Sequence, residues 1–168
     1  MDKITTTEME IALSLYFNRR TNLIVPNVSW GMFNHECDLI VLTPAGYAWE
    51  IEIKVDKYDL IKDKLKRHGH KDHRIKYLYF AIPQYLEKYI EHIPAHSGIV
   101  IVSESKWGYS KYMCRTIRKP SAIQKPYKFT DKDRYKIARL GALRIWTLKT
   151  NLINRIKDLN ECRNSKIK

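Results

Sequence analysis

Long apolar runs and paired cysteines are both missing from this 168-residue chain. No segment approaches the roughly 20 apolar residues of a membrane span. The three cysteines, Cys37, Cys114 and Cys162, are widely spaced and include no C-x-x-C pair, so they predict neither a disulfide framework nor a zinc site. The first residues are polar and lack the apolar core of a signal peptide. These absences predict a cytoplasmic protein with reduced thiols and no membrane anchor.

Negative charge is scarce as well. Against 31 lysines and arginines the chain has 18 aspartates and glutamates, which gives a formal net charge of +13. The length and the hydrophobic fraction of 44% are those of a globular protein with a real core. The excess of positive charge predicts a polyanionic partner, with nucleic acid first and an anionic membrane surface second. No basic amphipathic segment is evident near Met1, which favours nucleic acid over a membrane.

The segment His35–Val55 carries the clearest pattern in the chain. Its second half, WEIEIKV, alternates polar and apolar residues, as a strand with one buried face does. This alternation predicts that Glu50, Glu52 and Lys54 share one face of the strand. The first half reads as an apolar strand interrupted by a single acid, Asp38.

A three-residue turn, PAG, is expected to join the two strands. Such a loop commonly ends with a residue in the left-handed region, and Gly46 suits that position. If Thr43 faces Tyr47, Asp38 lies opposite Glu52, where paired Cβ atoms are roughly 5 Å apart. A loop of two or four residues would put Asp38 on the other face of the sheet.

Asp38, Glu52 and Lys54 together predict a catalytic site that holds a divalent metal and a phosphate. Two carboxylates this close repel each other unless a cation lies between them or one takes up a proton. Mg²⁺, with Mn²⁺ as a substitute, suits a site of one or two carboxylates, waters and a substrate phosphate. Lys54 would then hold a phosphate oxygen or an attacking water and offset charge in the transition state.

The spacing of these residues resembles a known superfamily. Asp38 followed, after a gap, by the EIK of Glu52–Lys54 is similar to the D…(D/E)xK signature of the PD-(D/E)XK nucleases. The likeness covers about Val25–Val102 and includes the runs EIEIKVDKYDLIKDK, YLYFAIP and HIPAHSGIVIV, which resemble MmcB-type DNA repair proteins and phage-borne nuclease-like proteins. Cys37 stands where the signature has proline, a departure that the superfamily tolerates.

The resemblance implies an α/β fold with a restriction-endonuclease-like core, in which helices flank a mixed β-sheet. It implies that Asp38 and Glu52 bind the metal, with the backbone carbonyl of Ile53 as a further ligand. An acid on the first helix often joins the metal site in this superfamily, and Glu8 and Glu10 are the two candidates. Periodicity favours Glu8 slightly. For either acid the alternative is a structural role, in which it complements the helix dipole.

A strongly basic helix is expected over Asp56–Arg67, directly after the metal-binding strand. Its charges could contact phosphates or form an ordinary solvated face. The next residues, HGHKDH, contain three histidines, for which a transition-metal site, phosphate or base contact and no specific chemistry all stay open. The nucleic-acid contacts expected in this region are Lys57, Lys62, Lys64, Arg67, His68 and His70.

The other elements follow from periodicity and turn residues. We expect a first helix that begins near Thr5, and a later helix over Tyr85–His92. The expected strands are 23–29, 75–82, 99–102 and an edge strand over 112–117. Trp30 and Phe33 precede the hairpin, where core packing is favoured over stacking on a base.

The sequence divides into a core over 1–118, a proline-containing linker over 119–129 and a long basic helix over 130–168. The helix has an apolar stripe of helical period, which predicts packing on the core or against a second copy in a homodimer. Its basic side stays available to a polyanion.

The predicted function is that of a metal-dependent nuclease, with DNA as the favoured substrate, in repair, recombination or phage or mobile-element DNA processing. Its location would be the cytoplasm of a bacterium or of a phage-infected host. One alternative is a protein that binds nucleic acid without cutting it, on the same nuclease-like fold. Another is a phage-derived protein whose basic surface binds an acidic protein. Only the first predicts cleavage that depends on a metal ion.

Overall fold

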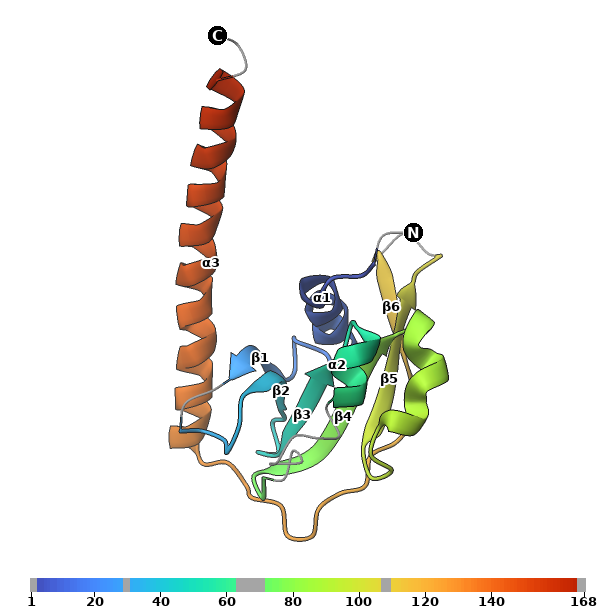
Figure 1. The fold of residues 1–168 in the computed structure, drawn as a ribbon. Coiled ribbons are helices and arrows are strands. Elements are labelled where there is room, and N and C mark those ends of the chain that lie inside the picture. Colours follow the sequence, from blue (N-terminus) through green and yellow to red (C-terminus); the bar gives the residue numbers. More distant parts are fainter. Residues whose placement is uncertain (1–2, 29–30, 63–71, 107–109, 166–168) are drawn as a thin grey trace.

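A six-stranded sheet forms the centre of the molecule in the computed structural model, which describes residues 3–28, 31–62, 72–106 and 110–165 (Figure 1). The strands lie side by side in the order in which they occur in the chain: β1 Leu23–Val28, β2 Cys37–Leu42, β3 Ala48–Ile53, β4 Ile75–Pro83, β5 Gly98–Glu104 and β6 Tyr112–Arg118. The helices are α1 Thr6–Tyr16, α2 Lys57–Lys62, the 3₁₀ helix η2 Gln84–His92 and α3 Asp131–Ser165.

The sheet is mixed. Strands β1, β2 and β3 form an antiparallel meander, β3, β4 and β5 run parallel, and β6 returns antiparallel to β5. Parallel neighbours need a crossover connection, and the segments that contain α2 and η2 supply the two crossovers. The α/β class, the mixed sheet flanked by helices and the C-terminal helix, all expected from the sequence, are confirmed.

The turn between β2 and β3 has the predicted geometry. The amide of Thr43 donates to the carbonyl of Tyr47 at 3.0 Å, and Gly46 has φ of +85°. A Cβ at Gly46 would also lie 3.1 Å from a side-chain carbon of Lys128. Both the backbone conformation and the close neighbour therefore favour glycine here.

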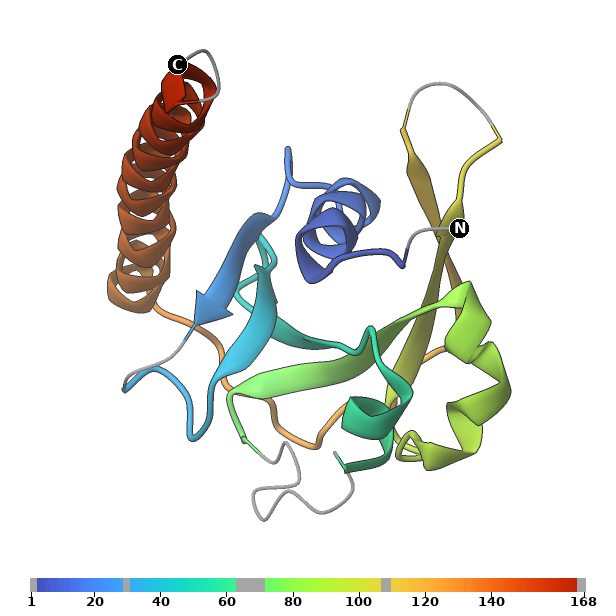
Figure 2. The same ribbon diagram turned by 45° about the horizontal axis from the view of Figure 1, so that its top comes forward.

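Helices cover both faces of the sheet (Figure 2). On one face α1 buries Met9 and Leu13 against strand residues that include Ile53. On the opposite face α2 and η2 bury a second cluster, which contains Leu60 and Phe80. Because side chains alternate along a strand, Trp49, Ile51 and Ile53 of β3 point to α1, and its acids point to the face that α2 covers.

Two expected helices differ from the sequence interpretation. The helix expected over Asp56–Arg67 begins at Lys57 and is described as far as Lys62, and residues 63–71 lie outside the described part of the chain. The element expected over Tyr85–His92 is a 3₁₀ helix that departs from helical geometry at Tyr89. Short connecting helices commonly take this tighter form.

Phe33 belongs to the core. Its side chain is buried, and its ring centroid lies 6.1 Å from that of Phe129. Phe33 therefore packs in the core, as the favoured alternative predicted, and its buried ring is not available to stack on a base. Trp30 lies outside the described residues.

The segment 119–129 is hydrogen-bonded to the strand ends. The amide of Ser121 donates to the backbone carbonyl of His96, and the amide of Phe129 donates to the backbone carbonyl of Gly46, both at 2.8 Å. This segment leads into α3, which packs against β1 near its start, where a Cβ at Gly141 would lie 3.3 Å from Val25.

Beyond that contact α3 projects away from the sheet (Figures 1 and 2). All side chains from Ile145 to Glu161 are exposed, including Leu148 and Leu152 at 66% and 60%. Packing against a second copy stays a prediction. None of the described helices is both long and apolar enough to cross a membrane.

Candidate active site and an adjoining buried cluster

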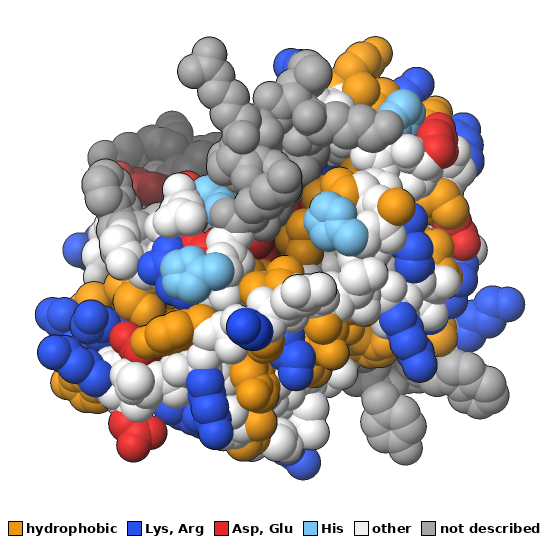
Figure 3. All heavy atoms as spheres, turned by 90° about the horizontal axis from the view of Figure 1, so that it is seen from below, with side chains coloured by type: hydrophobic (Ala, Val, Ile, Leu, Met, Phe, Trp, Pro, Cys, Tyr) orange, Lys and Arg blue, Asp and Glu red, His pale blue; other side chains and the backbone are white. Residues whose placement is uncertain are grey.

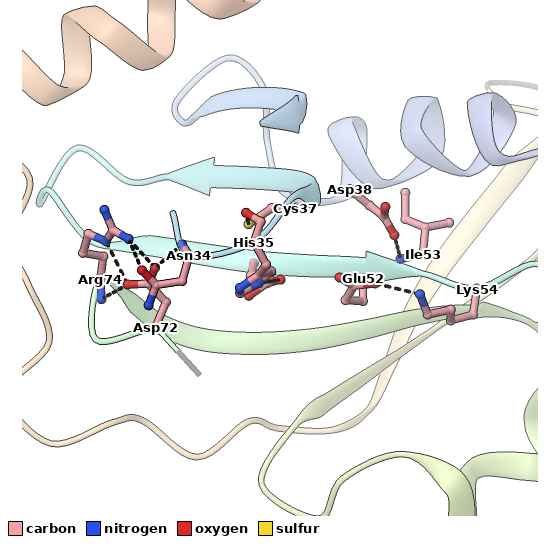
Figure 4. A network of polar contacts seen from close by, with 10 residues as sticks. Asn34, His35, Cys37, Asp38, Glu52, Ile53, Lys54, Asp72 and Arg74 are labelled. Atoms are coloured by element: carbon pink, nitrogen blue, oxygen red, sulfur yellow. Dashed lines mark hydrogen bonds and ion pairs between the residues drawn. The ribbon is translucent and has the colours of Figure 1, made fainter. Parts of the chain in front are cut away.

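The candidate active site lies where the β2–β3 ladder ends. The last pair of that ladder is Leu39 with Ile51, and the same register brings Asp38 opposite Glu52, as predicted. In place of a further ladder bond, the Asp38 carboxylate accepts the amide hydrogen of Ile53 at 2.8 Å (Figure 4). The side chain of Asp38 is thus fixed by the backbone of the neighbouring strand.

Glu52 and Lys54 form a buried ion pair next to Asp38. The Lys54 Nζ lies 2.7 Å from Glu52 Oε2, and the two side chains are 4% and 2% exposed (Figure 4). Asp59 of α2 approaches the same ammonium at 3.7 Å and is itself 56% exposed. Helix α2, which follows β3, therefore brings a third acid, Asp59, close to Lys54.

Among the described residues, three acids and one lysine meet at this site. Burial and, after it, the neighbouring charge of Glu52 raise the pKa of Asp38 to about 6, against the opposing effects of the Ile53 amide and Lys54. Removal from water and a like charge are the two ordinary reasons for a carboxyl group to retain its proton. A cation bound between the two carboxylates would cancel the repulsion from Glu52 and so lower the pKa of Asp38.

A second polar cluster adjoins the first on the same hairpin. Glu50, two residues before Glu52, is fully buried, and its Oε1 lies 2.5 Å from His35 Nε2. Cys37 completes the cluster, because one ligand atom from each of the three residues lies within 4.8 Å of the others. Burial, followed by the charges of Glu50 and Glu52, raises the pKa of the Cys37 thiol.

The loop that carries His35 is held by an ion pair between the buried Asp72 and the half-buried Arg74. Asp72 pairs with Arg74 at 2.6 Å and accepts the amide hydrogen of Asn34 at 3.0 Å. Arg74 also donates to the Asn34 side chain at 3.1 Å. Burial would raise the pKa of Asp72, but the hydrogen bonds from Arg74 and Asn34 hold it below its ordinary value. Figure 4 shows this ion pair, His35 with Cys37, and Glu52 with Lys54 in sequence along β3.

The structure separates the two helix-1 acids. Glu8 forms a capping box with Thr5 and also binds Lys111 and Tyr112 near β6. Hydrogen bonds from Lys111 and Thr5 lower the pKa of Glu8 to about 2, as expected for the structural alternative. Its contacts are with β6, not with β2.

Glu10 is better placed to approach Asp38. Burial raises the pKa of its carboxyl group, and the side chain of Asn27 of β1, close to it, acts in the opposite direction. The β1–β2 pairs Pro26 with Leu39 and Val28 with Cys37 set Asn27 across from Asp38. These neighbours place Glu10, rather than Glu8, on the side of the β1–β2 ladder where Asp38 lies. A metal-binding role for Glu10, and for the Ile53 carbonyl, stays a prediction.

The structure describes two of the six expected nucleic-acid contacts. Lys57 and Lys62 are exposed on α2, and the Lys57 ammonium lies 4.6 Å from the centre of the Tyr89 ring. Lys64, Arg67, His68 and His70 lie outside the described residues.

A cavity of about 520 Å³ lies at the carboxyl ends of β4 and β5. Its walls include Ile4, Tyr85, Val102 and Tyr112, but none of the three predicted catalytic residues. Ile4, Val102 and Tyr112 belong to the cluster around α1, so this cavity opens on the face opposite Glu52. It therefore does not correspond to the predicted site.

Comparison with known proteins provides one structural relative. The sequence matches no protein-family model and no curated protein. A solved structure described as a protein of unknown function from Silicibacter pomeroyi is similar, with a TM-score of 0.59 and 15% identity over 92% of this chain and 95% of that one. At this identity the likeness concerns the fold alone.

Sequence reasoning missed the His35–Cys37–Glu50 cluster. In the sequence, metal-binding patterns are expected from cysteine pairs, which are absent, and from the three histidines near residue 70. The available signal was the spacing H-x-C at the start of β2 together with Glu50, which alternation had already placed on the face of Glu52.

Proposed function

We propose that this protein is a metal-dependent nuclease that hydrolyses phosphodiester bonds, with DNA as the favoured substrate. The observation that carries the proposal is the convergence of Asp38, Glu52 and Lys54 at one end of the β2–β3 ladder. The proposal includes membership of the PD-(D/E)XK superfamily and a restriction-endonuclease-like core. The order of hairpin, helix, strand, helix and strand from β2 to β5 supports it.

The acids fit a hard divalent cation. Asp38 and Glu52 are oxygen donors close enough to raise the pKa of Asp38, and Mg²⁺ prefers carboxylates, waters and phosphate oxygens. Asp38 and Glu52 would hold the ion, with Glu10 as the helix-1 candidate. Bound there, Mg²⁺ would supply Lewis-acid neutralisation of the charge on the scissile phosphate.

The protein's own groups have distinct tasks in this proposal. The Ile53 amide fixes the direction of the Asp38 carboxylate. Glu52 orients the Lys54 ammonium, which donates to a phosphate oxygen or to the attacking water and so stabilises negative charge as it develops. Asp38 and Asp59 are less buried than Glu52 and Lys54, so a phosphate would approach from their side.

The surface charge supports a polyanionic substrate. The net charge is +13, and Lys57 and Lys62 are exposed on the helix that directly follows the site. Figure 3 shows Lys and Arg side chains around the rim of the face seen from below. Contacts of this kind bind phosphates without regard to sequence and weaken as salt rises.

The decisive experiment is incubation with a panel of labelled DNA and RNA substrates: duplexes, flaps, junctions and single strands. Each is tested with Mg²⁺, with Mn²⁺ and with a chelator. Cleavage with either metal and none with the chelator is the expected result. Lys54→Ala should abolish cleavage and retain much of the binding. Glu87→Gln, which alters a half-buried acid paired with Arg115 away from the site, is the control and should cleave normally.

A second candidate is a protein that binds nucleic acid without cutting it. The near-complete burial of Glu52 and Lys54 favours it, because a catalytic lysine has to reach its substrate. This candidate predicts salt-sensitive binding on the same panel. No metal-dependent cleavage would occur on any substrate.

A further inference from the structure

The His35–Cys37–Glu50 cluster offers a set of ligands that the nuclease proposal does not use. Imidazole, thiolate and carboxylate are the three side-chain types that bind zinc, and three protein ligands with one open position is a common zinc arrangement. Their atoms lie within 4.8 Å of one another. Bond lengths of about 2.0–2.3 Å in a tetrahedral site separate ligand atoms by roughly 3.5 Å, so small side-chain movements would close the site.

We propose that His35, Cys37 and Glu50 bind one divalent transition-metal ion of the zinc class, at a site distinct from the carboxylate site of Asp38 and Glu52. The thiol decides the class of ion, because thiolate ligands select zinc and similar ions, whereas Mg²⁺ prefers oxygen. The imidazole of His35 is equally suited to zinc.

The surroundings of the cluster hold its ligands in place. Asn34, next to His35, is hydrogen-bonded both to the buried Asp72 and to its partner Arg74. Glu50 is held on the central strand β3, and Cys37 begins β2. Ligands held on strands and clamped loops lose little conformational freedom when an ion binds, which favours affinity.

Burial also favours an ion at this position. The side chains of His35 and Glu50 are 4% and 0% exposed, and Cys37 is fully buried. A buried carboxylate carries a large desolvation penalty, which a directly bonded cation offsets. On binding, the His35–Glu50 hydrogen bond would be exchanged for a bond from each residue to the ion, and the thiol proton would leave to solvent.

Cobalt(II) provides the test, because a cobalt–thiolate bond gives a charge-transfer band in the near ultraviolet. We would use the Cys114→Ser/Cys162→Ser protein, in which Cys37 is the single thiol left. Titration with Co²⁺ should produce the band at one equivalent, and Zn²⁺ should remove it. Absence of the band in this protein overturns the proposal.

Three variants in that background locate the site. Cys37→Ser should abolish the band, and Glu50→Gln should weaken Co²⁺ binding at least tenfold. Asp38→Asn should retain the band, which separates this site from the proposed nuclease centre. A band that Glu50→Gln leaves at full strength and affinity would also overturn the proposal, as it would mark adventitious binding to the thiol alone.

One measurement needs no substitution and guards against variants that fail to fold. In the wild-type protein, Zn²⁺ should slow alkylation of Cys37 at least tenfold, while alkylation of Cys114 serves as the internal control. Mass spectrometry of the peptides reads both rates. Equal rates at Cys37 with and without Zn²⁺ would contradict the proposal, whether or not the protein cleaves nucleic acid.

Discussion

Glu50 and Glu52 are the same residue type, two positions apart on one strand and on one face, yet their surroundings differ. Glu50 faces an imidazole and a thiol. Glu52 faces an ammonium and a second carboxylate. The first set suits a borderline or soft ion and the second a hard ion. Neighbours, more than the acid itself, decide what chemistry a buried carboxylate can support.

The largest expected effect is on cleavage. Asp38→Asn keeps the shape of the side chain and removes one of the two charges that would hold Mg²⁺, so the cleavage rate should fall about a thousandfold, or roughly 4 kcal/mol. Rates on the best substrate of the panel measure this effect. Retention of full activity by Asp38→Asn would show that the two acids do not form the proposed centre.

The next effect concerns stability. Lys54→Met removes the ammonium from the buried ion pair with Glu52, and loss of one partner of such a pair costs roughly 3–5 kcal/mol. The double variant Glu52→Gln/Lys54→Met leaves no buried charge of that pair and should be more stable than the single one. Urea unfolding measures both.

In the neighbouring cluster, Cys37→Ser should cost only about 1 kcal/mol, because it exchanges one small neutral group for another.

A smaller effect concerns pH. The pKa of Asp38 is raised to about 6 in the folded protein, so between pH 4 and pH 6 the folded state binds more protons than the unfolded state. Protonation of Asp38 therefore stabilises the folded state, and this stabilisation is fully present below about pH 4. It is lost as pH rises through 6, which lowers the free energy of unfolding by at most about 3 kcal/mol.

The difference between wild type and Asp38→Asn isolates that contribution. Relative to wild type, Asp38→Asn should gain stability over this pH range and level off above it, in chemical unfolding curves at a series of pH values. Mg²⁺ at high pH should restore part of the wild-type stability and leave the variant unchanged. A difference that does not vary with pH would argue against a raised pKa at Asp38.

The smallest effect is on binding. Lys57→Ala and Lys62→Ala remove exposed charges from α2, and each should weaken nucleic-acid binding modestly and lower the salt slope by about one. Affinity measured at several salt concentrations gives that slope. Lys149→Ala removes the same charge from the projecting part of α3 and is the matched control, for which we expect a smaller effect. An equal effect of Lys149→Ala would indicate that α3 forms the binding surface.

The sequence was sufficient for the hairpin because its signals are local. The turn residues fix a loop length, the loop length fixes the register, and alternation then selects the face of Glu52 and Lys54. The same local logic predicted the α/β order and the buried strand β5. The superfamily resemblance stays an interpretation, since the structural relative bears on the fold alone.

The features that the sequence did not reveal depend on contacts between distant segments. Helical period favours Glu8 over Glu10 only slightly, and the two are separated by distant contacts, because Lys111 lies near Glu8 and Asn27 near Glu10. The His35–Cys37–Glu50 cluster likewise forms only once the loop before β2 is clamped by Asp72, which lies 38 residues after Asn34.

The shape of α3 has a consequence for local stability. A helix of 35 residues is about 50 Å long, and beyond Arg144, which donates to the Asn27 carbonyl, its described side chains are all exposed. A helix without tertiary packing depends on its own backbone bonds and opens readily. In a monomer, amide protons beyond residue 145 should therefore exchange with solvent far sooner than those between Asp133 and Leu140, and slow exchange along the whole length would report that another molecule covers it.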